Sequence, residues 1–243
     1  MTGDGVRYVV GLVLLAAVAG CGGPAKAQQP KVQGPMPAAE LRTRLLPAAL
    51  PGGWASVADR PDGKAQGGAA ASVPPPACEG LLDGQTVVDA TTAAASASAT
   101  AAFSGGHTVD NGVISGAEKL YSFPGDGAHR AMRDMRELVA RCASVDLRTA
   151  EWEPPDTAGF AVADGPRLGD ESLVVRGTVT DRATGRSDRA DATVVRVGSS
   201  LVVISTVLTL TPAEMETVMA FMPAAVAQFS SERPEPVDAA AGG

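Results

Sequence analysis

Three runs rich in β-branched residues fill most of the second half of the sequence and limit its fold most strongly. They cover residues 173–180 (LVVRGTVT), 190–197 (ADATVVRV) and 201–210 (LVVISTVLTL). Runs of this length and composition are typical of β-strands. A short segment around Gly185 joins the first two runs, and only residues 198–200 join the last two. Because such short connections suit antiparallel neighbours, the pattern predicts an antiparallel meander.

The clearest helical pattern covers residues 128–142. Its apolar residues recur on one face of a helix and are Met132, Met135, Val139 and Cys142. Asp126 precedes the pattern at a position from which its side chain can cap the helix.

A second helix is predicted from Thr211 onward, because Thr211 suits the cap and Pro212 the first turn. We expect Pro223 to kink this helix. Its predicted inner face is formed by Met215, Val218, Met219, Met222, Val226 and Phe229. Core packing is the favoured role of the methionines, and the alternative is that they line a soft apolar pocket.

The first half of the sequence gives weaker signals. Leucines at helical spacing predict a helix over residues 37–46, which ends before a Gly-Gly-Trp turn at Trp54. The further elements expected here are a helical turn over 78–82, a strand over the last half of 90–104, a hairpin turn at Asn111-Gly112 and a strand over 113–123.

This alternation of helices with groups of strands predicts an α+β fold, in which the helices pack on one face of an antiparallel sheet. An apolar content of 45% is sufficient for a core. We expect one domain over residues 37–230, with a flexible, low-complexity loop at 58–76 and a disordered tail at 231–243.

The N-terminus indicates export. Residues 9–19 (VVGLVLLAAVA) are too short to span a bilayer, which takes about 20 helical residues, but they match a signal-peptide core. The following Val18-Ala19-Gly20-Cys21 resembles the lipobox of bacterial lipoproteins. That resemblance implies a signal peptide over 1–20, a lipid on the sulfur of Cys21 and a tether over 21–36. The alternatives are a secreted protein with an unrelated cysteine and an uncleaved signal anchor.

Cys78 and Cys142 remain once Cys21 is assigned to the anchor. An even pair in an oxidising compartment predicts a disulfide, and the alternative is two independent buried thiols. Two histidines and three cysteines leave little material for a metal site, and no cofactor is expected. A net charge of −7 without a basic cluster argues against nucleic acid as a partner.

The order of these elements resembles the extracellular sensor domains of actinobacterial serine/threonine kinases (PknH-like) and of stand-alone lipoproteins. The similarity covers residues 38–230 and rests on element order and on the pair Cys78 and Cys142. The chain lacks a second cysteine pair in its C-terminal half, and it has Ala140-Arg141 where a tryptophan is common. The resemblance implies a ligand-sensing or binding role and no catalytic residues.

For catalysis, the best local candidates are Ser104, His107 and Asp110, which no nucleophile-elbow motif accompanies. His129, three residues after Asp126, is interpreted as an exposed histidine at the start of a helix. We therefore predict a non-enzymatic sensing or binding module that is lipid-anchored on the extracytoplasmic face of the cell membrane. Its partners would be the membrane and an unidentified ligand or envelope protein. The alternatives are a lipid carrier and, with less support, an envelope hydrolase.

Overall fold

The computed structural model describes residues 35–58, 78–105, 115–147, 156–208 and 210–231. Cys21, the predicted signal peptide and the predicted turn at Asn111-Gly112 lie outside this part of the chain. The same is true of almost all of the predicted tether, loop and tail. Among the described residues, no helix is long and apolar enough to cross a membrane.

Eight strands form one sheet in which all neighbours are antiparallel. Their order across the sheet is β1-β2-β3-β8-β7-β6-β5-β4, so β6, β7 and β8 form the predicted three-strand meander, which β5 extends by one strand. The α+β class with an antiparallel sheet is therefore confirmed. The strands are β1 (Ala55–Ala58), β2 (Ala97–Ser104), β3 (Gly116–Ser122), β4 (Ser144–Leu147), β5 (Asp156–Asp164), β6 (Glu171–Thr180), β7 (Ser187–Val197) and β8 (Ser200–Thr206).

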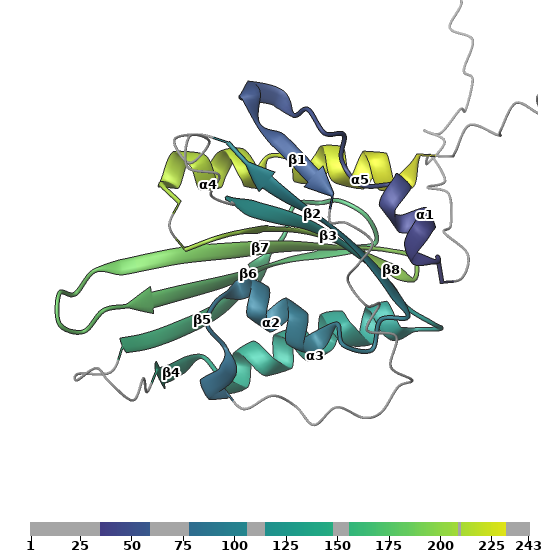
Figure 1. The fold of residues 1–243 in the computed structure, drawn as a ribbon. Helices are drawn as coiled ribbons and strands as arrows, with labels where there is room; N and C mark the ends of the chain where they lie inside the picture. Colours follow the sequence, from purple (N-terminus) through teal and green to yellow (C-terminus); the bar gives the residue numbers. More distant parts are fainter. Residues whose placement is uncertain (1–34, 59–77, 106–114, 148–155, 209, 232–243) are drawn as a thin grey trace, which may run out of the picture.

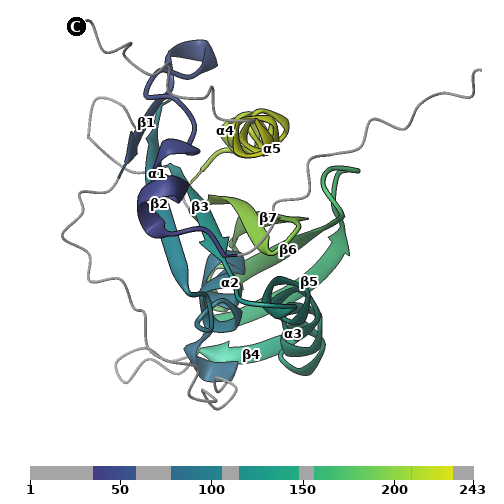
Figure 2. The same ribbon diagram turned by 90° about the vertical axis from the view of Figure 1, so that its right-hand side faces the viewer.

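The helices lie on both faces of the sheet, and the prediction of one covered face is wrong. Figures 1 and 2 show one helical layer on each side. One face carries α1 (Ala38–Thr43), α4 (Pro212–Met219) and α5 (Met222–Ser230), and the other carries α2 (Gly84–Thr91) and α3 (Gly127–Arg141).

The physical reason is that the central strands are apolar on both sides. All seven residues of β8 are buried. Val202 and Ile204 belong to the core beneath α1, α4 and α5, whereas Leu201 and Val203 belong to the core beneath α2 and α3. Because successive side chains of a strand point to opposite faces, β8 needs cover on both.

The helices on the two faces do not cover the same strands. On one face, α1 contacts β2 and β3, while α4 and α5 contact β7 and β8. On the other face, α2 and α3 contact strands between β5 and β8. Each face is therefore left uncovered toward one edge of the sheet, and a hollow lies at each of these places.

The helix ends show how local sequence determined the elements. The predicted C-terminal helix is divided between Met219 and Met222, and Pro223 lies in the first turn of α5, as its expected kink requires. Thr211 and Glu214 form a capping box at α4. Asp126 precedes α3 but makes no capping hydrogen bond, because its carboxylate pairs with Arg130 instead.

A disulfide joins Cys78, in the short 3₁₀ turn Cys78–Gly80, to Cys142, which directly follows α3. The two Cα atoms are 5.4 Å apart. Cys142 is 1% exposed and belongs to the core beneath α2 and α3. The predicted pairing is therefore present in the structure.

Candidate functional site

A groove of about 600 Å³ lies where the sheet is uncovered beside α4. We call it the α4 groove. Strands β6 and β7 form its floor, and α4 with the segment before it forms one wall. Its floor residues are Val174, Arg176, Arg189, Asp191 and Thr193, and its wall residues include Leu208, Leu210, Met215 and Met219.

Strand alternation places these floor residues. Leu173 and Val175 of β6 point into the core beneath α2 and α3. Their neighbours Val174 and Arg176 therefore point to the opposite face, into the α4 groove. In the register of the β6–β7 pair, Arg176 lies directly opposite Asp191. The meander thus brings two charged side chains together that are distant in the sequence.

Asp191 holds two arginines at the floor of the groove. Its side chain is only 5% exposed and accepts hydrogen bonds from Nε of Arg189 at 2.8 Å and from Nε of Arg176 at 3.4 Å. Nη2 of Arg189 also pairs with the second carboxylate oxygen. The hydrogen bond to Asp191 raises the pKa of Arg189. One carboxylate serves two guanidinium groups, so these three side chains carry a net charge of one positive unit.

The backbone of Asp191 is held as well. Its N–H donates to Oγ1 of Thr206 at 2.9 Å, and that hydroxyl donates to the Asp191 carbonyl at 3.2 Å. Thr206 is 2% exposed. The carboxylate that positions both arginines is therefore attached to rigid sheet structure.

Three further carboxylates lie at the rim of the groove. By strand alternation, Asp188 belongs to the opposite face of β7, and it borders the groove from the end of that strand. Its carboxylate pairs with Arg186 at 3.0 Å. Asp164 is the last residue of β5, and Glu216 is exposed on α4. The floor of the groove is thus positive, while its rim carries negative groups.

The wall of the groove is apolar. Leu210 and Met215 are buried in the core beneath α4, and Met219 packs against that core. All three also line the groove. Both expectations for the methionines of this helix therefore apply, because Met215 and Met219 belong to the core and also border the groove.

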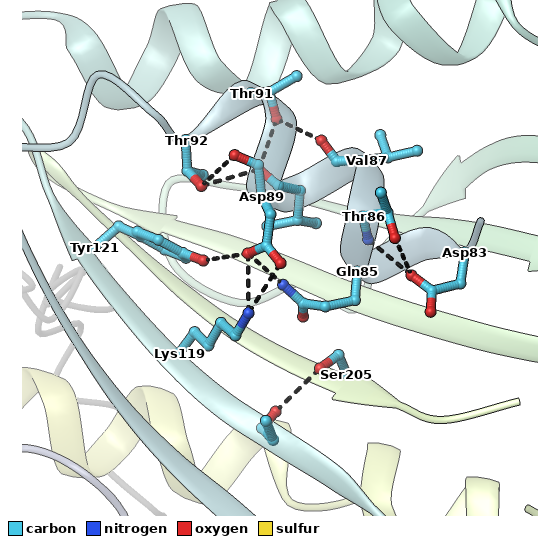
Figure 3. Close-up of polar contacts among 12 residues, drawn as sticks. Asp83, Gln85, Thr86, Val87, Asp89, Thr91, Thr92, Lys119, Tyr121 and Ser205 are labelled. Atoms are coloured by element: carbon cyan, nitrogen blue, oxygen red, sulfur yellow. Dashed lines mark hydrogen bonds and ion pairs between the residues drawn. The ribbon is translucent and has the colours of Figure 1, made fainter. Parts of the chain in front are cut away.

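A second hollow of about 380 Å³ lies on the opposite face, beside α2 and strands β2 and β3. There Asp89 accepts hydrogen bonds from Tyr121 Oη at 2.9 Å, from Lys119 Nζ at 2.9 Å and from Gln85 Nε2 at 2.8 Å (Figure 3). Burial, followed by the Asp89 charge, raises the pKa of Tyr121. These hydrogen bonds attach α2 to β3, although Oε1 of Gln85 is buried without a hydrogen-bond partner among the described residues. The α4 groove is the better binding candidate, because it is larger and has an apolar wall.

The residues singled out by sequence do not form a site in the described chain. Ser104 ends β2 half-buried, and His107 and Asp110 lie outside the described residues. The His129 side chain is 62% exposed, and its Nδ1 is 3.5 Å from a carboxylate oxygen of Glu171. Within the described ranges, no group of three or more His, Cys, Asp or Glu side chains could hold a metal ion.

Arg176, Arg189 and Asp191 were missed as site residues. Their only signal was the presence of charged residues inside β-branched runs, as in LVVRGTVT and DRADATVV. Comparisons of the chain with protein-family models, with curated proteins and with solved structures found no match.

Proposed function

We propose that the protein is a lipid-anchored, non-enzymatic binding protein on the extracytoplasmic face of the cell membrane, and that the α4 groove holds its ligand. The groove carries this proposal. Its volume of about 600 Å³ falls in the range of small-molecule sites, roughly 300–1,000 Å³. An apolar wall with a few fixed polar groups is also the usual composition of such sites.

The anchor rests on the lipobox-like sequence that ends at Cys21. The disulfide between Cys78 and Cys142 supports an oxidising compartment, where such bonds persist. The similarity of element order to actinobacterial sensor domains supports a binding role.

The arrangement of the elements suits capture from the surroundings. Arg44, just after α1, donates hydrogen bonds to the carbonyls of Phe229 and Ser231, so the two ends of the described chain are neighbours. In Figure 1 these ends lie on the right, whereas the β6–β7 hairpin and α4 lie on the left. A tether entering at α1 would therefore leave the groove at the opposite end of the domain.

A lipid carrier is the second candidate. Leu210, Met215 and Met219 favour it, because they give the groove an apolar wall. Methionine side chains adapt readily to the shape of an apolar ligand.

Native mass spectrometry of the full chain, purified from a bacterial envelope, tests the binding role. Val174→Trp fills the floor of the groove, and Val57→Trp is the matched control on an exposed valine of β1. We expect a small-molecule adduct on the wild type and on Val57→Trp, and its loss from Val174→Trp. An adduct retained by Val174→Trp, or none on the wild type, would overturn the proposal.

The anchor is tested separately by cell fractionation. Cys21→Ala should move the protein from the membrane fraction to the soluble fraction, because it removes the sulfur that carries the lipid. Retention of this variant in the membrane would rule out lipidation as the anchor.

A further inference from the structure

We propose that the ligand of the α4 groove is an amphipathic anion with one anionic headgroup on an apolar chain. The headgroup, which is a carboxylate, phosphate or sulfate, binds Arg176 and Arg189, and the chain lies along Met215 and Met219. This inference rests on the proposed function, because it names the ligand class of the same groove.

The arginines have donors left for a headgroup. Within the described part of the chain, Arg176 uses only Nε, and Arg189 uses Nε and Nη2, both toward Asp191. Nη1 and Nη2 of Arg176 and Nη1 of Arg189 therefore remain available to a ligand. Each side chain is 44% exposed, so these donors are accessible from the groove.

Asp191 prepares both guanidinium groups for binding. A buried carboxylate that already holds their Nε atoms reduces the side-chain freedom that a ligand would otherwise have to restrict. Since Asp191 neutralises only one of the two positive charges, an anion is attracted to the floor. The planar fork of an arginine also matches the geometry of carboxylate and phosphate oxygens.

The carboxylates of the rim decide where the headgroup can lie. Asp188 is paired with Arg186, whereas Asp164 at the end of β5 and Glu216 on α4 are exposed, so an anion is disfavoured at the rim and favoured on the strand floor. The exposed carboxylate on α4 gives the competing hypothesis, in which a cationic headgroup pairs with Glu216.

The apolar part of the ligand has a surface beside the arginines. Val174 lies two residues from Arg176 on the same face of β6, and Met215 and Met219 lie one helical turn apart on α4. A chain placed between these side chains removes apolar surface from water on both sides, which favours binding.

Isothermal titration calorimetry of the full chain carrying Cys21→Ala, which bears no acyl groups of its own, tests the ligand class. The probes are decanoate, decylamine and acetate, so chain and charge vary separately. Decanoate should bind at least tenfold more tightly than decylamine, because the floor is positive, and tenfold more tightly than acetate, because the chain contributes. Equal or tighter binding of decylamine, or no binding of decanoate, would overturn the inference.

Two variants locate the headgroup. Arg176→Gln and Arg189→Gln should each weaken decanoate binding roughly tenfold, the usual loss for one charge-assisted hydrogen bond. Arg182→Gln is the matched control, because Arg182 pairs with Asp146 of β4 and neither residue lines the groove. Unchanged affinity in both floor variants would contradict the assignment. If one of these variants misfolds, the comparison of decanoate, decylamine and acetate on the chain without groove substitutions still tests the ligand class.

The two proposals fail differently. If Val174→Trp removes a native adduct but the groove shows no preference for decanoate, the binding role stands and the proposed ligand class is wrong. The absence of both the adduct and decanoate binding removes both proposals.

Discussion

The backbone N–H of Leu46 donates a 2.7 Å hydrogen bond to Oε2 of Glu118, a carboxyl that is fully buried. This bond attaches the segment after α1 to strand β3. Oε1 of Glu118 has no hydrogen-bond partner among the described residues. Burial raises the pKa of Glu118 to about 7, although the Leu46 N–H acts in the opposite direction. The folded protein therefore holds a proton here that the unfolded chain releases near pH 4.5.

We predict that Glu118 makes the protein less stable as the pH rises from about 4.5 to 7. The folded state binds more protons than the unfolded state in this interval, so the free energy of unfolding falls, by on the order of 3 kcal/mol. Urea unfolding at several pH values measures this. Glu118→Gln should remove most of this slope, whereas Glu216→Gln, at an exposed residue of α4, should keep it. An unchanged slope in Glu118→Gln would contradict the prediction.

Removing the disulfide should destabilise the protein strongly. Cys78 and Cys142 are separated by 64 residues, and a bridge over such a loop stabilises by about 4 kcal/mol, chiefly by restricting the unfolded chain. The double variant Cys78→Ser/Cys142→Ser should show this loss in urea unfolding, and the unreduced parent is the reference. Equal stability of the two would mean that the bridge restricts little of the unfolded chain.

Gly177 is predicted to accept no side chain. A Cβ at Gly177 would lie 2.7 Å from the Cα of Asp83 and from the N of Gly84, where the start of α2 packs on β6. Gly177→Ala should therefore displace α2 and lower the free energy of unfolding by about 1–3 kcal/mol. Gly80→Ala is the control, because a Cβ at Gly80 meets nothing within 4 Å. Thermal unfolding compares them, and similar melting temperatures would speak against this close packing.

The cap of α4 should contribute to stability and to the shape of the groove. Thr211 Oγ1 accepts the N–H of Glu214, and the Glu214 carboxylate accepts the N–H of Thr211 at 3.1 Å. Thr211→Ala should cost about 1 kcal/mol. Thr217→Ala on the same helix should change stability little, since among the described residues the hydroxyl of Thr217 bonds only to the Ala213 carbonyl. Equal losses in the two variants would exclude a special role of the cap.

Segments with strong periodicity were predictable from the sequence. The three strands of the meander and α3 were found within a few residues, because one face or both faces of each are apolar. α2 was missed because its residues GQTVVDAT begin with glycine and include β-branched residues. It is helical because Asp83 caps it, accepting the N–H of Thr86 at 2.7 Å, and because it packs on β6.

β5 (DTAGFAVAD) was missed for another reason. Its small residues have low strand propensity, and pairing with β6 along nearly its whole length overrides this. The α4 groove could not be predicted either, because its floor depends on the register that places Arg176 opposite Asp191. The pairing of β5 with β6 and the register of Arg176 with Asp191 exist only in the assembled sheet.

The pairing of β3 with β8 has a consequence for how the chain folds. Residue Gly116 meets Thr206, and Ser122 meets Ser200, so one edge of β3 has no partner until almost the whole sequence is present. Closing so large a loop is entropically costly and slows folding. The N-terminal three strands cannot complete their sheet before residues 200–206 are synthesised, and a chain truncated before residue 200 exposes β3 as an open edge prone to aggregation.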